Sequence, residues 1–389
     1  MLQDVTGNGV DAMVPRERMC DGARRLRDTY AITPGAPLYR REFGLMEGTL
    51  ERWQQEGMPQ DVPRERLFSY DPRGQYDLTD LGGCEAAFLP AFEEKRVEDR
   101  GEYEVIQDSA GRHLLVFKGR RDGFMPEYLA HPVRDAATWE RDVLWRLNPA
   151  SPERFADLDA KMERAKAAAA QGMIMTQQIV GGYMYLRSLI GPADLLYAFY
   201  DQPDLIHACM RAWLALADAV TARHQQYVTF DQVSLDEDIC YNKGALISDA
   251  MIREFLFPYY QQLLSGIRSR QIDKSRHLYF HVDTDGYAPA VIDLYRDSTG
   301  VDAMSPFEVA SGCDVVEIGH KYPDLVMCGG IDKRVLARSR AEIDAFLERV
   351  IPPMRARGGY IPTCDHAVPT EVPYGNYLHY RERMTELGG

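Results

Sequence analysis

The chain has 389 residues, 45% of them hydrophobic, and its 59 Asp and Glu residues outnumber its 45 Lys and Arg residues, for a formal net charge of −14. This composition is typical of a folded globular protein, and its net charge disfavours binding to nucleic acid or to an anionic membrane. No apolar run reaches the roughly 18 residues of a membrane span, and the first residues lack the layout of a signal peptide. We therefore expect a cytoplasmic protein, with its seven scattered cysteines mostly reduced.

The first quarter of the chain is irregular and punctuated by Gly and Pro, with a helical pattern only at 49–57. We expect residues 1–100 to form an N-terminal, partly helical cap packed on a single structural unit over 101–389. Within that unit, residues 101–119 contain two short strand-like runs around the turn at 108–111, which predicts a β-hairpin insertion.

From residue 151 onward the pattern becomes regular. Ser151 and Pro152 predict a helix start, with Gly172 beyond the end of that helix. Short apolar strands then alternate with longer amphipathic helices. The strands are predicted at 173–180, 232–238, 277–283, 303–308, 325–332 and 359–365, and the main helices at 205–226, 249–270 and 339–357.

This alternation predicts parallel βαβ units and an α/β fold. A (β/α)₈ TIM barrel fits best, because nearly every strand ends in polar residues and barrel active sites lie at the C-terminal strand ends. An open doubly wound sheet is the alternative, although no GxGxxG segment follows the first strand to hold a dinucleotide.

The segment HVDTDG at 281–286 places His281, Asp283 and Asp285 at alternate positions, so their side chains point to the same side of an extended chain. Other predicted strands also end in acidic, imidazole or thiol groups. These are Glu237, Asp238, Glu308, Asp332, Cys364, Asp365 and His366. Each of these residues taken alone is better explained by a structural role, such as loop capping or pairing with Lys243, Lys333 or Arg334, than by a catalytic one.

Taken together, His281, Asp283 and Cys364 offer nitrogen, oxygen and sulfur donors suited to Zn²⁺, with a fourth position open for catalysis. HxD is a common tripeptide, so the spacing does not decide between a metal site and plain acid-base groups.

Three segments, 241–264, 329–354 and 358–380, resemble the uroporphyrinogen decarboxylase superfamily, which implies a (β/α)₈ barrel. The resemblance begins near residue 38. Members that decarboxylate uroporphyrinogen carry an RQAGRY-type segment near the N-terminus that grips the tetrapyrrole carboxylates. This chain has PLYRREFGLMEGTLERW there, so we do not expect a tetrapyrrole substrate.

The chain looks more like the cobalamin-linked methyltransferase branch of that superfamily. In its coenzyme M members the zinc ligands lie in an HxC segment and in a later PGC segment. His281 and Cys364 match two of these ligands, whereas Asp283 stands where the coenzyme M members have Cys. An oxygen ligand suits Lewis-acid activation of an ether oxygen better than thiolate transfer. The resemblance thus implies the first methyltransferase of an O-demethylase system, moving a methyl group from a methyl aryl ether or similar donor to Co(I) of a separate corrinoid protein. The chain lacks the DxHxxG pattern of corrinoid domains, so cobalamin would come with that partner.

In this hypothesis Zn²⁺, or an acid such as Glu237 or His366, polarises the leaving oxygen, while Asp285 orients the substrate or a ligating histidine. The predicted substrate-binding residues are Tyr183, Met184, Tyr185, Tyr241, Lys243 and Glu308. Met184 has the alternative of packing in the barrel rim.

Two other functions stay open at this point. One is a cofactor-independent decarboxylase or lyase that acts on a small carboxylated substrate and uses Asp283 or Asp285 to stabilise a cationic intermediate. The other is a non-catalytic barrel that only binds a ligand, which the number of acidic strand ends disfavours. The oligomeric state is open, with a homodimer as one alternative.

Overall fold

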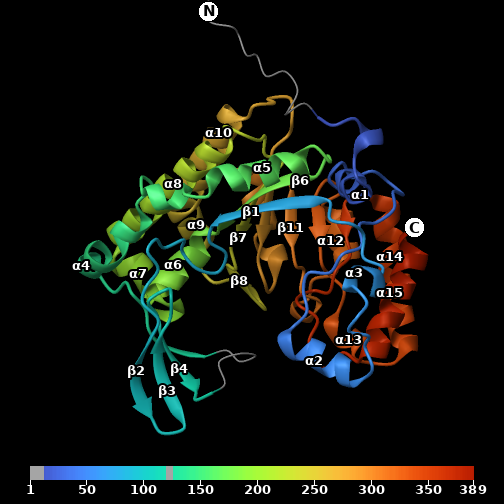
Figure 1. Ribbon diagram of the computed structural model, residues 1–389, viewed down its shortest axis with the longest axis horizontal. Helices are drawn as coiled ribbons and strands as arrows, with labels where there is room; N and C mark the ends of the chain where they lie inside the picture. The colour runs from blue at the N-terminus through green and yellow to red at the C-terminus, as the bar shows by residue number, and fades with distance from the viewer. Residues whose placement is uncertain (1–12, 120–125) are drawn as a thin grey trace, which may run out of the picture.

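The computed structural model describes residues 13–119 and 126–389, and at its centre is a parallel sheet with strand order β1-β6-β7-β10-β11-β12-β13 (Figure 1). The strands surround a common interior and the helices lie outside them, as in a (β/α)₈ barrel. The strands are β1 (Gln75–Leu81), β6 (Ile174–Val180), β7 (Gln232–Asp236), β10 (Tyr279–Asp283), β11 (Ala303–Ser305), β12 (Val326–Cys328) and β13 (Tyr360–Ile361).

All six predicted strands are present and each is shorter than predicted. In β7, β11, β12 and β13 the predicted C-terminal ends continue as loops. The predicted boundary at residue 100 is wrong, since β1 lies inside the range assigned to the cap and pairs with β6 in the barrel sheet. Its sequence, QYDLTDL, carries polar side chains at alternate positions and so does not stand out as an apolar strand. Residues 1–12 of the predicted cap lie outside the described residues.

An extended segment at 38–46 runs between the two edges of this sheet. The backbone N–H of Asp71, just before β1, donates to the carbonyl of Arg40, and the N–H of Val368, after β13, donates to the carbonyl of Gly44. Leu45 also forms a parallel bridge with Val368. The segment therefore connects the residues that precede the first strand of the barrel sheet with those that follow the last.

Two of the predicted helices are confirmed, as α8 and α14, and one is divided. Ser339 forms a capping box with Glu342 at the start of α14. The predicted helix 249–270 is split at Leu256 into α9 and α10, because a proline occupies the first turn of α10. The α-helices of the cap and of the segment before β6 are α1 (Asp21–Tyr30), α2 (Glu47–Gln55), α3 (Arg64–Leu67), α4 (Ala136–Thr138) and α5 (Leu158–Ala169). Those that follow are α6 (Gly182–Ile190), α7 (Pro192–Asp201), α8 (Pro203–His224), α9 (Asp249–Phe255), α10 (Phe257–Arg270), α11 (Ile292–Thr299), α12 (Val315–Lys321), α13 (Lys333–Leu336), α14 (Arg340–Arg357) and α15 (Tyr374–Gly388).

The helix predicted from Ser151 differs at its start. Pro152 opens a short 3₁₀ turn, and the α-helix α5 begins only at Leu158. Gly172 follows the end of α5 with a positive φ of 75°, which a residue with a Cβ rarely adopts.

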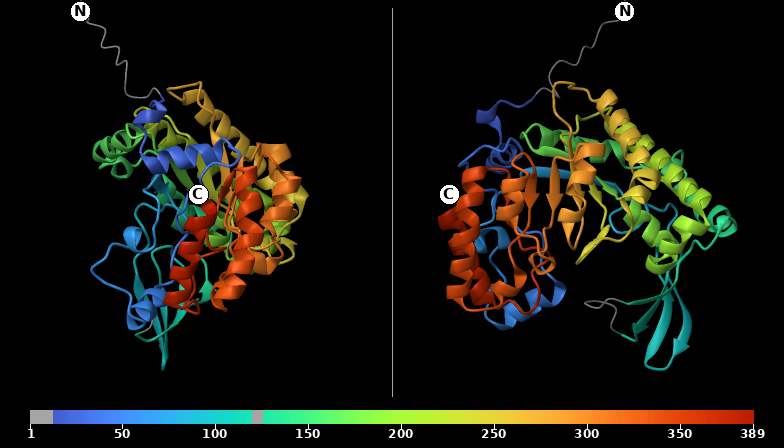
Figure 2. Two further views of the ribbon diagram at one scale, coloured as in Figure 1. Left: turned by 90° about the vertical axis from the view of Figure 1, so that its right-hand side faces the viewer. Right: turned by 180° about the vertical axis from the view of Figure 1, so that it is seen from behind.

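The predicted hairpin at 101–119 is confirmed as part of a larger antiparallel sheet. β3 (Tyr103–Gln107) and β4 (His113–Phe117) pair with each other and are flanked by β2 (Lys95–Arg100) and β5 (Glu127–Ala130). This sheet projects from the barrel on the side to which the C-terminal ends of the barrel strands point (Figures 1 and 2). It thus stands beside the barrel mouth.

Helix α8 is long and apolar enough to cross a membrane by length and composition alone, but half of its most apolar window is buried inside the protein. The indole N–H of Trp213 on this helix donates to the carbonyl of Val180 at 2.8 Å. The apolar side of α8 therefore packs against the barrel.

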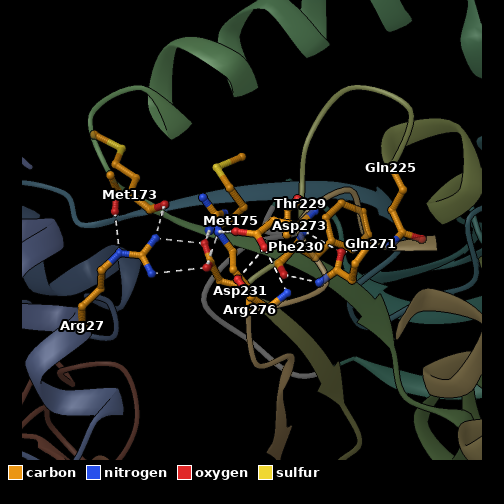
Figure 3. Close-up of polar contacts among 12 residues, drawn as sticks. Arg27, Met173, Met175, Gln225, Thr229, Phe230, Asp231, Gln271, Asp273 and Arg276 are labelled. Carbon is orange, nitrogen blue, oxygen red and sulfur yellow. Dashed lines mark hydrogen bonds and ion pairs between the residues drawn. The ribbon is translucent and has the colours of Figure 1, made fainter. Parts of the chain in front are cut away.

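A buried ion pair closes the barrel at the N-terminal ends of its strands (Figure 3). Asp231, just before β7, accepts hydrogen bonds from Arg27 Nη1 at 3.2 Å and Nη2 at 3.1 Å. The same carboxylate accepts from the backbone N–H of Met175 at 2.9 Å, and its side chain is only 3% exposed. The pair joins α1, β6 and β7 at one point.

We expect Asp231→Asn to lower the free energy of unfolding by about 3 kcal/mol, because it leaves the Arg27 charge without its buried partner. Chemical denaturation monitored by circular dichroism measures the loss. The control is Asp293→Asn, which breaks an exposed surface pair with Lys321 and should cause no measurable loss. Equal midpoints for the two variants would contradict the role given to this pair.

Candidate active site

A cavity of about 650 Å³ occupies the barrel interior and extends to the C-terminal strand ends. Side chains of a strand point alternately inward and outward, so every second residue faces this space. The inward residues are Gln75 and Asp77 of β1, Gln178 of β6, Gln232, Ser234 and Asp236 of β7, His281 and Asp283 of β10, Ser305 of β11 and Cys328 of β12. Met184, Asp238, Asp285 and His366 line the cavity from the loops and helix that follow the strands. Most strand residues that face this space are therefore polar or acidic, and Leu26, Tyr30, Tyr39, Phe43 and Ile361 add apolar surface to the lining.

A continuous chain of hydrogen bonds crosses this interior and ends on Asp283. The amide nitrogen of Gln232 donates to His281 Nδ1 at 2.8 Å, and His281 Nε2 donates to Ser305 Oγ at 2.8 Å. The hydroxyl of Ser305 in turn donates to Asp283 Oδ1. Thr176 donates to the amide oxygen of Gln232 at 3.1 Å, which sets the orientation of that amide. Because an amide NH₂ only donates, the histidine is held in its Nε2–H tautomer.

Burial lowers the pKa of His281 to about 4, so the imidazole is neutral at physiological pH. Both of its ring nitrogens are already hydrogen-bonded within the chain just described. His281 therefore works as a neutral relay that positions Ser305 and, through it, Asp283.

Five carboxyl groups that line the cavity have raised pKa values, namely Glu42, Asp77, Asp236, Asp283 and Asp285, and the last three are raised furthest. Burial is the largest cause for Asp283, whose pKa is raised to about 7, and the neighbouring charge of Asp236 adds to the shift. Burial and the charge of Asp77 raise the pKa of Asp236 to about 6. Burial and the charge of Asp238 raise the pKa of Asp285 to about 6, although the imidazole of His366 at 3.8 Å acts in the opposite direction. Such groups exchange protons near neutral pH, as general acids and bases must.

The three predicted zinc ligands are not brought together. His281 and Asp283 face the cavity, but on the last strand Ile361 and Thr363 face it, and Cys364 therefore points to the opposite side. There its thiol is fully buried, which raises its pKa well above the usual value of a thiol. Within 13–119 and 126–389 no group of three or more His, Cys, Asp and Glu side chains is arranged to hold a metal ion.

The predicted ligand set thus does not fit Zn²⁺, for a reason of strand geometry. Cys364 forms an isolated parallel bridge with Ile331 beyond the end of β13, and it is buried without lining the cavity that Thr363 faces. Both nitrogens of His281 are also engaged by protein groups. Zinc binding stays a prediction, and no step of the chemistry below depends on it.

Glu237, predicted as an acid catalyst, is also on the wrong side of its strand. Its neighbours Asp236 and Asp238 line the cavity, whereas Glu237 is fully buried and accepts hydrogen bonds from the hydroxyl of Tyr260 at 2.6 Å and from the backbone N–H of Tyr183 at 3.1 Å. Burial raises its pKa to about 7. It anchors the start of α6 and has no access to a substrate in this cavity.

Of the predicted substrate-binding residues, Met184 alone lines the cavity. Tyr183 and Tyr185 are buried in α6, and the hydroxyl of Tyr185 donates to the carbonyl of Cys209 at 3.2 Å. Tyr241 and Lys243 lie exposed in a loop that contains the short strands β8 (Cys240–Tyr241) and β9 (Gly244–Ala245).

The loop-capping alternative is correct for two other acidic strand ends. Glu308 pairs with Lys333 at 3.0 Å and accepts from the N–H of Gly286 at 2.9 Å. Asp332 caps α13 and pairs with Arg334 at 2.9 Å. The predicted catalytic residues Asp285 and His366, in contrast, both line the cavity.

Sequence reasoning missed several residues that the cavity needs, namely Asp77, Gln232, Ser234, Asp236 and Ser305. A count of alternate positions back from Asp238 would have found three of them, because Gln232, Ser234 and Asp236 are all in step with it. Asp77 had no such signal, since β1 was not recognised as a strand.

Comparison with known proteins gives the family. The uroporphyrinogen decarboxylase (URO-D) family model matches residues 124–387. The chain therefore belongs to the uroporphyrinogen decarboxylase family, and the predicted (β/α)₈ fold is confirmed.

Solved structures agree on the fold. A methyltransferase from Methanosarcina mazei is similar with a TM-score of 0.58 and 12% sequence identity, over 94% of this chain and 99% of that one. Two weaker similarities are to a B12-independent methionine synthase from Shewanella sp. W3-18-1 (TM-score 0.33, 12% identity, 58% of this chain and 65% of that one) and to a putative vitamin-B12 independent methionine synthase from Listeria monocytogenes (0.31, 15%, 58% and 68%). These two scores are too low to bear on the fold. No curated protein sequence matches the chain.

Raised carboxyl pKa values make the folded protein less stable as the pH rises. Asp236, Asp283 and Asp285 bind protons more tightly when folded than when unfolded, so their contribution to stability falls as the pH rises from about 4 to 7. The lowered pKa values of His281 and His131 act in the opposite direction.

We therefore expect the melting temperature to be higher near about pH 5 than near about pH 7.5, and the difference to shrink in Asp236→Asn, which removes one of these titrations. Differential scanning fluorimetry across this pH range measures the melting temperature. The exposed Asp201→Asn variant should keep the wild-type difference. If Asp236→Asn kept it too, the buried acid cluster would not be titrating as described.

Proposed function

We propose that the protein is a methyltransferase that takes a methyl group from a small methyl ether bound in the barrel mouth and passes it to a separate corrinoid protein. The observation that carries this proposal is Asp283, an acid with a pKa of about 7 at the end of a hydrogen-bonded relay and on the wall of a cavity. Membership of the uroporphyrinogen decarboxylase family and the shared fold with a methyltransferase support the reaction class.

Ether cleavage needs such an acid. When the bond between the methyl carbon and oxygen breaks, the electron pair stays on oxygen, and an unprotonated phenolate or alkoxide is a poor leaving group. A proton from Asp283 delivered to that oxygen in the transition state supplies the missing assistance. Ser305 and His281 hold the carboxyl in place throughout, because their own hydrogen bonds are complete without the substrate.

Cobalamin, carried by a partner protein, would supply the nucleophile that accepts the methyl group. The cavity extends to the C-terminal strand ends, next to Asp285 and His366, and this is the face to which the partner would have to dock. The antiparallel sheet β2–β5 stands beside that face (Figure 1).

The cavity volume of about 650 Å³ suits one aromatic ring with its substituents. A compact donor of this kind agrees with the absence of an RQAGRY-type segment from the sequence. The cytoplasmic location and the homodimer stay predictions.

A decarboxylase of the uroporphyrinogen type is the second candidate, favoured by the family itself and by the acidic residues Asp283 and Asp285, which would stabilise a cationic intermediate. Its substrate must bring a carboxylate into the cavity. The carboxyl groups that already line this space repel a further anion, so we place this function second.

Asp283→Asn should lower the rate of methyl transfer by about 100-fold or more, because an amide cannot give up the proton. The assay follows the absorbance change of cob(I)alamin on methylation by aryl methyl ethers. In the wild type the rate should fall as the pH rises above about 7, where Asp283 loses its proton. Asp285→Asn should cost less, roughly 10-fold to 100-fold, as expected for a group that orients the substrate.

The control is Glu237→Gln, which removes a buried carboxylate that does not reach the cavity. It should lower the melting temperature and leave the rate per folded molecule close to that of the wild type. A rate unchanged in Asp283→Asn but abolished in Glu237→Gln would reverse the assignment of the acid.

A further inference from the structure

The wall of the cavity carries more negative charge than its surroundings balance. Six carboxyl groups line it, and three of them have partners. Glu42 accepts from the hydroxyl of Tyr377 at 3.1 Å, Asp238 pairs with Arg187 at 2.5 Å, and Asp285 faces His366. The remaining three are Asp77, Asp236 and Asp283, from three different strands.

None of these three forms an ion pair among the described residues, although the charge of Arg73 partly offsets the raised pKa of Asp77. Asp77 accepts from the amide of Gln75, and Asp283 accepts from Ser305. The carboxylate of Asp236 has no hydrogen-bond partner in 13–119 and 126–389, and the negative charge of Asp77 acts on it. Buried carboxylates normally have a positive partner, so this part of the site is incomplete without a ligand.

The arginines that line the cavity do not supply the missing charge. Arg41 donates to the backbone carbonyl of Asp71 at 2.8 Å and lies over the ring of Tyr70. Arg73 is exposed, before the first residue of β1. Asp236 lies at the C-terminal end of β7, and neither guanidinium forms an ion pair with it.

A hydroxyl next to Asp236 is unused as well. Ser234 lies two residues before it on β7, faces the same cavity and is 8% exposed. Its Oγ has no hydrogen-bond partner among the described residues. In the strand register Ser234 is level with His281 and Gln178, so it points into the middle of the cavity wall. A buried hydroxyl without a partner is a second sign that a polar ligand group belongs here.

A small metal ion does not suit these groups, because no three carboxylate, imidazole or thiol side chains of the described residues converge closely enough to hold one. An organic cation does suit them. Its charge is spread over a larger group, which several carboxylates can approach from different strands, and the cavity of about 650 Å³ has room for it.

We infer that the substrate is a cation: an aryl methyl ether that also carries a protonated amino group, with the ammonium beside Asp236 and within reach of Ser234. The ether group of this substrate rests on the proposed function, and its positive charge is the new part of the inference. Asp236 and Asp283 are direct register partners on β7 and β10, so one substrate can meet both. Asp236 then selects the substrate by its charge, while Asp283 acts on the ether oxygen.

Isothermal titration calorimetry with three ring-matched probes tests this: para-methoxybenzylamine, para-methoxybenzyl alcohol and para-methoxybenzoate, which are a cation, a neutral compound and an anion. With wild-type protein near about pH 7 and at low salt, the amine should bind at least about 10-fold more tightly than the alcohol, and the benzoate more weakly than both.

Asp236→Asn should reduce the affinity for the amine at least about 10-fold and leave that for the alcohol within about 3-fold, because only the charged probe loses a partner. The matched control is Asp201→Asn, an exposed carboxylate at the end of α7, which should change neither. Asp77→Asn should show a smaller loss in the same direction, and it replaces Asp236→Asn if the latter does not fold.

Equal binding of amine and alcohol, failure of the amine to bind, or an equal loss of both probes in Asp236→Asn would each overturn the inference. These measurements need no corrinoid, so their outcome is separate from that of the methyl-transfer assay. Tight, Asp236-dependent binding of the amine without any methyl transfer would leave the cation site standing and refute the proposed reaction.

Discussion

The polar side chains that face the interior of this barrel compete for partners in a confined space, and the hydrogen-bond chain from Gln232 through His281 and Ser305 to Asp283 shows how the protein satisfies four of them. The chain runs in one direction, with each group donating to the next. A neutral imidazole is essential to it, since a protonated ring could not accept the proton offered by Gln232. Burial keeps the imidazole neutral.

The same burial explains the chemistry of the mouth. A carboxyl group that loses water without gaining a cation keeps its proton to higher pH, and Asp236 and Asp283 are in that situation to different degrees. Asp283 is supported by Ser305 and is suited to proton transfer. Asp236 has no such support and is better suited to holding a positive group of the substrate. Two side chains of one kind thus take different roles because their neighbours differ.

The two ends of the barrel contrast in the treatment of charge. At the N-terminal ends of the strands Asp231 is buried, but Arg27 and a backbone N–H satisfy it, and it serves stability. At the C-terminal ends the carboxylates are left short of partners, which costs stability and leaves binding energy for a ligand. This division is the usual one in (β/α)₈ barrels, where one face stabilises the fold and the other performs the chemistry.

The sequence by itself determined the alternation of strands and helices, six of the seven strands of the barrel sheet, the family and the convergence of His281, Asp283 and Asp285, because these follow from local periodicity and from motif spacing. Only the tertiary structure decided which residues of the last strand face inward. The chain around Cys364 is short and irregular, so its side-chain direction depends on pairing with β12 and not on its own pattern. It also decided that β1 is a barrel strand, since the polar side chains of that strand are explained only by the acidic cavity that they help to form.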